Sequence, residues 1–295
     1  MQTRILFFLL ILGPVTQAQT FSEKITKELS FEKPSANNAL ILANINGSVK
    51  VVGYAGDLVL LEATKSIEAK TAPRLQKGKA EIQIGIIDRA DTLIVYVRDG
   101  CNQFSKNEKR SGHSGEEGWS YHSQIQHDCQ LGYDFTMDFT VKVPSALHLL
   151  VSTVNKGDVV VENVTGMVKA RNINGGIRLV KLKNEADAHT INGDVDIEYT
   201  ENPGKDCKFY TLNGNINALF QPSLSANLAF ESFNGSLFTN LTRMESLPQE
   251  VQETKHGNGI QYKISGNRYQ VGNGGPLLNF ETFNGNVYLK EKQTK

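Results

Sequence analysis

The sequence predicts an all-β protein, a β-solenoid (β-helix) built from coils of 18–21 residues. The first observation is a nine-residue register that begins at Gly157 and reads GDVVVENVT, GMVKARNIN, GGIRLVKLK, NEADAHTIN and GDVDIEYTE. The second is that positions three, five and eight of these nines are aliphatic in 14 of 15 places, while glycine opens four of the five. The third is that Asn-Gly recurs at every second nine, at 174–175 and 192–193. Repetition at a fixed period is typical of stacked units that bury one shared core.

Each nine is expected to contain one short strand. Positions three and five alternate with residues that are often polar, which is the pattern of a strand with one buried face. A glycine then provides the backbone freedom that a sharp corner needs. Two nines make one coil, and parallel strand pairing sets neighbouring coils about 4.8 Å apart. The alternative is a sandwich or meander whose hairpins use Asn-Gly turns, but hairpins do not require a constant nine-residue phase.

The same phase continues on both sides of the central nines. Asn-Gly pairs at 213–214, 234–235 and 284–285 extend it with insertions, and the last of them is expected to form the final coil. Near the start, the phase places in the core Val49, Val51, Tyr54, Leu58, Leu60 and Ala63. The glycines expected at the corners are Gly47, Gly157, Gly175, Gly193, Gly214, Gly235 and Gly285.

The asparagine that precedes many of these glycines is interpreted as a structural residue that supports the conformation of the backbone at the corner. Asparagine tolerates left-handed conformations, and stacked asparagine amides can hydrogen-bond along the axis of a repeat. The alternative is an amide ladder that grips a ligand.

The N-terminus has the parts of a secretory signal peptide over residues 1–18. Arg4 is followed by an apolar run at 5–12, a Gly-Pro breaker and a small-residue end at Ala18, after which we expect cleavage. A buried N-terminal helix is the alternative. The chain is therefore expected to be exported, to the periplasm, the cell surface or the medium.

No segment after the signal peptide is apolar enough to span a membrane as a helix. The 31 basic and 31 acidic residues balance, which argues against a nucleic-acid partner.

The remaining chain divides into three parts. Residues 19–38 form a lead segment. Residues 39–150 form an N-terminal β region with strands at 80–87 and 92–97, a short helix or loop at 68–79 and a loop insertion at 99–132. Residues 151–292 form the coils, with an excursion at 240–275.

Two of the three cysteines flank the polar loop insertion. Cys101 and Cys129 are the natural disulfide pair in an exported chain, and closing that loop would stabilise the fold by roughly 3 kcal/mol. Cys207 is then a buried or partly buried free thiol. Trp119 and Tyr121 in the same loop either contact a partner or seat the loop on the coils.

The loop also holds residue types that bind metals. A Zn or Cu site could be drawn from them, but their spacing fits no standard ligand pattern and a disulfide would consume both thiolates, so a solvated disulfide loop is the preferred interpretation. We therefore expect no cofactor. The metal candidates are His113, His122, His127, Glu116, Glu117 and Asp128.

No catalytic constellation is evident. Asp194, Asp196, Glu198 and Glu201 lie near one another, but strand alternation alone places charges on the outer face. The chain lacks the second glycine and the repeated aspartates of a calcium-binding β-roll, and it has no G-x-S-x-G, H-E-x-x-H or phosphate-loop motif. A carbohydrate-active β-helix enzyme, which needs carboxylates converging on one groove, remains the alternative hypothesis.

The repeat resembles a bacterial family of exported proteins named putative adhesins, a domain of unknown function. The similarity lies in Ser152 to Val159, in the Asn-Ile-Asn-Gly and Thr-Ile-Asn-Gly turns, and in the ending from Gly274-Gly275-Pro276 to Thr282–Val287; it covers residues 38–292. The resemblance implies a right-handed β-solenoid outside the cytoplasm, with no catalytic residues to carry over. We therefore expect a non-enzymatic binding or scaffold protein at the cell envelope, with a glycan or an envelope protein as partner.

Overall fold

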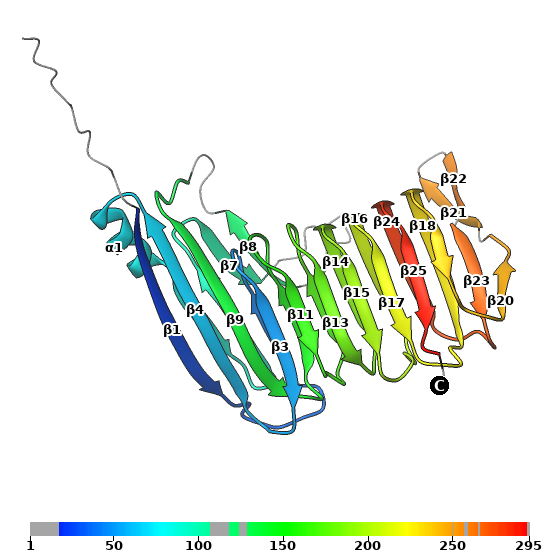
Figure 1. Ribbon diagram of the computed structural model, residues 1–295, viewed down its shortest axis with the longest axis horizontal. Helices are drawn as coiled ribbons and strands as arrows, with labels where there is room; N and C mark the ends of the chain where they lie inside the picture. The colour runs from blue at the N-terminus through cyan, green and yellow to red at the C-terminus, as the bar shows by residue number, and fades with distance from the viewer. Residues whose placement is uncertain are drawn as a thin grey trace, which may run out of the picture.

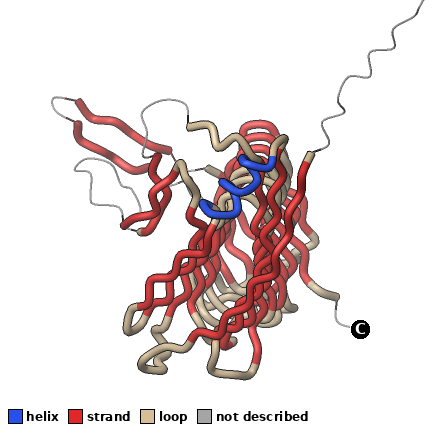
Figure 2. Tube along the Cα trace, turned by 90° about the vertical axis from the view of Figure 1, so that its left-hand side faces the viewer, coloured by secondary structure: helices blue, strands red, loops and turns tan. Residues whose placement is uncertain are grey.

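The computed structural model describes residues 18–106, 118–123, 129–249, 251–256, 259–264 and 266–293. Its regular structure is almost entirely β-strand, and one helix, α1 (Ala72–Glu81), lies within the described part of the chain. Two large sheets extend along the long axis of the molecule, one in front of the other (Figure 1). The view along that axis shows that they face each other as two layers (Figure 2). The prediction of an all-β protein is confirmed.

The first large sheet, sheet A, has ten strands, which follow one another in the spatial order β1 (Gln19–Leu29), β4 (Val59–Ala69), β9 (Asp134–Pro144), β3 (Val49–Tyr54), β11 (Val159–Glu162), β13 (Ile177–Leu182), β15 (Val195–Tyr199), β17 (Ile216–Phe220), β25 (Val287–Glu291) and β19 (Leu237–Thr239).

The second, sheet B, has eleven strands in the order β20 (Met244–Leu247), β23 (Asn267–Val271), β18 (Ala226–Asn234), β24 (Leu277–Asn284), β16 (Cys207–Asn213), β14 (Ala186–Asn192), β12 (Val168–Arg171), β10 (His148–Ser152), β2 (Ala39–Ala43), β6 (Thr92–Arg98) and β5 (Gln83–Asp88). Two hairpins stand apart from these sheets: β7 (Asn102–Lys106) with β8 (Trp119–Ser123), and β21 (Val251–His256) with β22 (Gly259–Ile264).

Through its central part the chain alternates strictly between the two sheets. From β10 to β17, even-numbered strands join sheet B and odd-numbered strands join sheet A. Val159 pairs in parallel with Ile177 and Ile177 with Val195, each eighteen residues further along the chain. We call one pair of consecutive strands and its connections a rung. The eighteen-residue step expected from the sequence therefore separates β11, β13 and β15 in sheet A and β12 from β14 in sheet B, and the next strand of each sheet follows after 21 residues.

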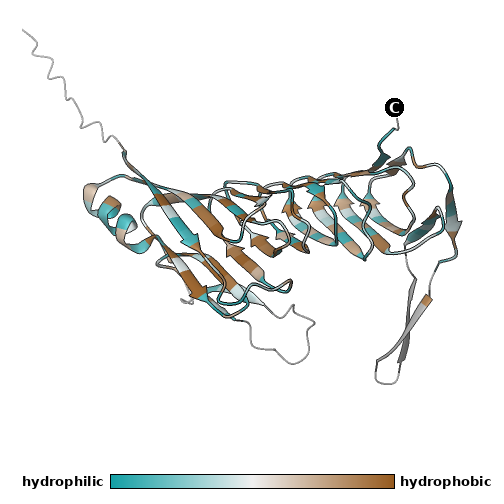
Figure 3. Cartoon of the chain, turned by 90° about the horizontal axis from the view of Figure 1, so that it is seen from below, coloured by the Kyte–Doolittle hydropathy of each residue, from teal (hydrophilic) through white to brown (hydrophobic). Residues whose placement is uncertain are grey.

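The side chains alternate along each strand as the register requires. Val159, Val161, Ile177, Leu179 and Val195 are at most 1% exposed and belong to one core that lies between the sheets. Apolar and polar residues alternate along the strands in Figure 3. Burying these aliphatic side chains supplies the main driving force for stacking, since no rung can cover its own inner face.

Position eight of the nines does not behave as expected. Val164 and Leu182 are buried, but Ile173 is 38% exposed and Ile191 is half-buried. The two corners of a rung have different geometry. At one corner the position-eight residue points into the core. At the Asn-Gly corner it points outward, between a residue whose side chain binds a corner carbonyl and an asparagine whose side chain binds another asparagine.

The phase predicted after Gly56 is also wrong. Leu58 is exposed and Leu60 is half-buried, whereas their neighbours Val59 and Leu61 are buried. The reason is topological, because β4 does not continue as a parallel strand of the next rung. It pairs antiparallel with both β1 and β9 at one end of sheet A, and this reversal shifts the buried face by one residue.

The final Asn-Gly segment does not form the terminal rung. β24 lies between β16 and β18 in sheet B, and β25 lies between β17 and β19 in sheet A. The last strands of the chain are therefore inserted one rung inside the end of the stack. The excursion that precedes them contributes β20 and β23, which extend sheet B beyond β18 through an antiparallel pair.

The opposite end of the molecule is closed by elements that the sequence predicts as a lead segment and a short helix or loop. β1 occupies residues of the expected lead segment and forms the edge of sheet A. Helix α1 begins after Thr71 with a proline in its first turn, which is favourable there, and residues 80 and 81, expected to begin a strand, end this helix instead. Lys65 is buried at this end and forms an ion pair of 2.9 Å with Glu23 of β1.

Candidate binding surface

The Asn-Gly corners stack into a continuous ladder along the axis. The side-chain amides of Asn155, Asn174, Asn192, Asn213 and Asn284 are joined in sequence by hydrogen bonds of 2.7–2.9 Å, and Asn234 completes the series at 2.9 Å from Asn284. Each inner amide donates to one neighbour and accepts from the other. The predicted hydrogen bonding of stacked asparagine side chains along the axis is confirmed. Ligand binding by these amides stays a prediction.

A second, buried column of polar side chains lies behind the asparagines. The hydroxyl of Thr190 donates to the carbonyl of Gly175, that of Thr211 to Gly193, and that of Thr282 to Gly214, at 2.8–3.1 Å. Thr190, Thr211 and Thr282 are at most 2% exposed. The corner carbonyls therefore receive hydrogen bonds from the neighbouring rung, which satisfies backbone groups that a sharp turn leaves without a ladder partner. The other members of this column are Asn44, Thr153, Asn172 and Ser232.

The corner glycines are required for a different reason from the one expected. Among the seven predicted glycines a positive φ occurs at Gly47, Gly193 and Gly285, at 119°, 159° and 154°. At all seven, however, an added Cβ would come closer than 3.0 Å to backbone atoms, a separation that real Cβ atoms essentially never show. For six of them the cause is the close approach to a glycine backbone of the neighbouring rung, whereas Gly47 lies against the backbone of Met137.

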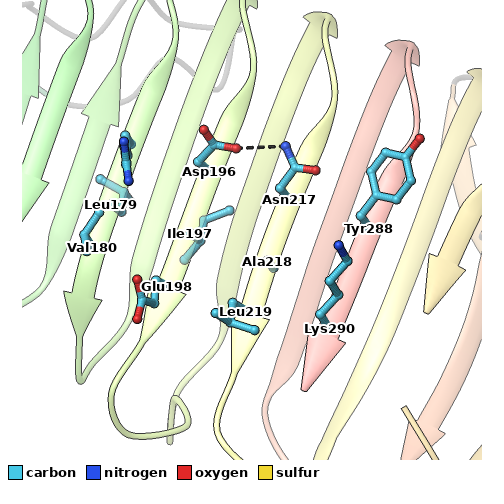
Figure 4. A pocket seen from close by; sticks show the side chains of 11 residues that line it. Leu179, Val180, Asp196, Ile197, Glu198, Asn217, Ala218, Leu219, Tyr288 and Lys290 are labelled. Carbon is cyan, nitrogen blue, oxygen red and sulfur yellow. Dashed lines mark hydrogen bonds between the residues drawn. The ribbon is translucent and has the colours of Figure 1, made fainter. Parts of the chain in front are cut away.

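A shallow groove lies on the outer face of sheet A across β13, β15, β17 and β25, with a volume of about 350 Å³. Its first row consists of Arg178, Asp196, Asn217 and Tyr288, which are paired in register on these four neighbouring strands. Figure 4 shows Asp196, Asn217 and Tyr288 side by side, with the carboxylate of Asp196 accepting a 2.8 Å hydrogen bond from the Asn217 amide. Each strand thus contributes one side chain to a row with a spacing of about 4.8 Å.

The second row of the groove is mixed. Glu198, Leu219 and Lys290 are paired in register on β15, β17 and β25 (Figure 4). Glu198 forms a 2.9 Å ion pair with Lys292, while no described residue forms an ion pair with Lys290. The groove therefore combines a half-buried tyrosine, an apolar floor and planar or charged hydrogen-bonding groups.

The four carboxylates singled out from the sequence are engaged in separate contacts. Asp194 accepts the backbone N–H of Asn215 at 2.7 Å, and Glu201 forms a 2.6 Å ion pair with Lys183. Asp196 and Glu198 are two residues apart on the same face of β15. Asp196 binds the Asn217 amide, and Glu198 pairs with Lys292. Each carboxylate therefore contacts another rung on the outer surface, which agrees with the preferred interpretation of an outer charged face.

The disulfide loop is seated on the outer face of sheet B. Cys101 and Cys129 are bonded, which confirms that prediction. The hydroxyl of Tyr121 lies 2.9 Å from the carbonyls of Ala43 and Val97 and accepts the N–H of Val97. Desolvation of this buried hydroxyl raises the pKa of Tyr121 well above its usual value.

Aromatic contacts complete this small second core. Phe104 stacks between Tyr96 and Trp119, at ring distances of 4.6 and 5.7 Å, and the guanidinium of Arg89 lies over the Trp119 ring. This arrangement is the one expected if the aromatic residues seat the loop. A partner contact by Trp119 or Tyr121 stays a prediction.

Of the candidate metal ligands, only His122 lies within the described residues. His113, Glu116, Glu117, His127 and Asp128 lie outside them. The Nε2 atom of His122 is 3.2 Å from the Ser120 hydroxyl.

The predicted signal peptide covers residues 1–18, of which only Ala18 lies within the described part of the chain. Among the described residues, no helix combines the length and apolar character needed to cross a membrane.

Cys207 is a buried free thiol, as predicted. Its Sγ lies 3.3 Å from the hydroxyl of Tyr199, and burial raises the pKa of both groups. Both side chains point into the core, so this pair contributes to packing between β15 and β16.

Sequence reasoning missed the aromatic residues of the last two rungs. Phe233 and Phe283 each precede an Asn-Gly pair, and Phe238 and Tyr288 each follow its glycine by three residues. In the structure the first two rings stack at 4.8 Å and the second two at 5.2 Å. The matching offsets were the available signal, since equal positions in adjacent rungs must lie side by side.

The sequence matches no protein-family model and no curated protein. Among solved structures it is similar to a putative cell adhesion protein from Clostridium sporogenes, at 12% identity and a TM-score of 0.42, over 92% of this chain and 100% of that one. It is also similar to a putative adhesin from Bacteroides fragilis, at 10% identity and a TM-score of 0.30, and to a putative lipid binding protein from Parabacteroides distasonis, at 8% and 0.24. Both of these matches cover 92% of this chain and 97% of the other. Identity and TM-score at this level leave the family and the function of the chain unassigned.

Proposed function

We propose that this chain is an exported, non-enzymatic, adhesin-like binding or scaffold protein of the bacterial cell envelope. In this proposal sheets A and B are the two broad faces of one right-handed β-solenoid with coils of 18–21 residues. The alternation of consecutive strands between two parallel sheets supports it. The Cys101–Cys129 disulfide and the signal-like N-terminus support an oxidising compartment outside the cytoplasm.

The binding surface in this proposal is the groove on sheet A, and its ligand is a glycan. The observation that carries it is the in-register row of Arg178, Asp196, Asn217 and Tyr288. Planar guanidinium, carboxylate and amide groups can each exchange hydrogen bonds with sugar hydroxyls, and the tyrosine ring offers an apolar face with a polar tip. A row that repeats at the strand spacing suits a partner that is itself repetitive.

The test is a glycan array probed with residues 19–295, followed by affinity measurement of the best glycan by calorimetry. Tyr288→Ala and Asn217→Ala should each weaken binding about tenfold, equivalent to roughly 1.4 kcal/mol. Thr140→Ala is the control, because it removes an exposed side chain from β9, elsewhere on sheet A. Unchanged affinity in both groove variants would refute the location of the glycan site.

Export is tested by the intact mass of the protein expressed in a bacterium, since the proposal expects the loss of residues 1–18.

A further inference from the structure

A second, smaller pocket lies at the edge of sheet B, where its outer face meets the Asn-Gly corner. Its volume is about 220 Å³, and three neighbouring strands, β16, β24 and β18, form it. The pocket belongs to the last rungs of the stack and is separate from the groove on sheet A. Its lining residues are Tyr210, Glu231, Ser232, Phe233, Glu281, Thr282 and Phe283.

Two carboxylates face this pocket from adjacent strands. Glu281 is paired in register with Tyr210 on one side and with Glu231 on the other. Like charges at directly paired positions of a sheet repel each other. Glu231 is exposed, and no described residue forms an ion pair or hydrogen bond with its carboxylate. The Glu231 side of the pocket therefore carries a negative charge that the described part of the protein does not compensate.

Aromatic rings are the second, independent feature. Phe233 and Phe283 stack at 4.8 Å with an angle of 4° between their planes, and they are 74% and 43% exposed. Tyr210 lines the same pocket and packs against His189 at 4.2 Å. Large exposed aromatic side chains of this kind mark binding surfaces, and the negative ring face attracts cations.

We propose that this pocket binds a glycan that carries free amino groups, of the glucosamine type. The apolar face of one sugar ring stacks on the exposed ring of Phe233, and its ammonium group forms an ion pair with Glu231. Charge complementarity selects the ammonium group, and the flat, open platform of rings favours a sugar ring. A lysine side chain would need a deeper slot to bury its flexible methylene stem. This site is distinct from the sheet A groove, so the two proposals can fail independently.

The test is calorimetric titration of residues 19–295 with a fully deacetylated chitosan hexamer, in a mildly acidic buffer that keeps the amines of the sugar protonated. The N-acetylated hexamer of the same length is the ligand control, and it should bind at least tenfold more weakly. Glu231→Gln and Phe233→Ala should each lower affinity for the deacetylated hexamer by about tenfold. Glu68→Gln, which removes an exposed carboxylate of β4 outside both sites, should leave it unchanged. Circular dichroism of each variant confirms that the sheets are intact.

Three results would overturn the inference. Equal binding of the two hexamers would mean that the amino group is not recognised. Unchanged affinity in Glu231→Gln would place the ligand elsewhere. Displacement of the hexamer by a lysine-rich peptide at equal concentration would identify the site as a general cation site and not a glycan site.

Discussion

The buried hydroxyl of Thr211 allows a sharp test of how the corners are held together. Thr211 is fully buried, and its Oγ1 donates a 2.8 Å hydrogen bond to the carbonyl oxygen of Gly193 in the neighbouring rung. Thr211→Val replaces the hydroxyl with a methyl group of nearly the same shape. Because the change preserves volume, its effect isolates the hydrogen bond.

The expected magnitude follows from two opposing contributions. Losing the bond and leaving the Gly193 carbonyl without its donor costs about 1–3 kcal/mol. Burying one more methyl group returns about 0.8 kcal/mol. We therefore expect Thr211→Val to lower the free energy of unfolding by about 0.2–2.2 kcal/mol, and to lower the melting temperature by up to a few degrees.

Urea unfolding monitored by circular dichroism measures this difference. Thr140→Val is the matched control, since Thr140 lies on the exposed face of β9 and the same substitution there should change stability by less than about 0.5 kcal/mol. Equal unfolding midpoints for the two variants, with equal denaturant dependence, would refute the claim that the threonine column secures the corners.

Three further predictions concern the core, the disulfide loop and alkaline stability. Val195→Asp should destabilise by several kcal/mol because Val195 is fully buried, whereas Asp196→Ser on the outer face should stay within about 0.5 kcal/mol; equal thermal melts would contradict the register. Replacing Cys101 and Cys129 with serine should cost roughly 3 kcal/mol in urea unfolding, and no loss would show that the bond does not restrain the unfolded chain. Burial raises the pKa of Cys207, so its stabilising effect is complete below the unfolded thiol pKa of about 8.5 and is lost as pH rises toward the folded value. Unfolding free energies should therefore fall as pH rises above about 8.5, less steeply in Cys207→Ala, and parallel pH profiles would count against this assignment.

Local sequence patterns, such as the alternation of apolar and polar residues, predicted much of the repeat. Alternation at positions three and five identified Val159, Val161 and Val195 as core residues, and it did so because a strand with one buried face has a period of two. The asparagine ladder followed from equal positions in successive rungs. The Cys101–Cys129 pair followed from the loop that those cysteines flank.

The failures share one physical cause. A register specifies which residues face the same way, but it does not specify which strands pair. After Gly56 the chain reverses and β4 pairs antiparallel with β9, which moved the buried face from Leu58 to Val59. The outward direction of Ile173 likewise depends on the corner geometry that its neighbours adopt in the stack.

The candidate sites show the same limit. Tyr288 and Asn217 form one row, and Phe233 and Phe283 form one stack, only because the last strands of the chain insert between rungs that precede them in sequence. Every Asn-Gly corner can stack on every other, so local preference does not select the order of the rungs.

By itself the sequence determined the all-β class, the eighteen-residue step, the inner face of each central strand and the signal-like N-terminus. Those properties depend on residues close together in the chain. The tertiary structure alone decided the order of the final rungs, the antiparallel closure by β1 and β4, and the side chains that meet in the two pockets. These depend on pairing between distant strands whose edges are chemically alike, and that pairing is selected by the packing of the whole core and its two ends.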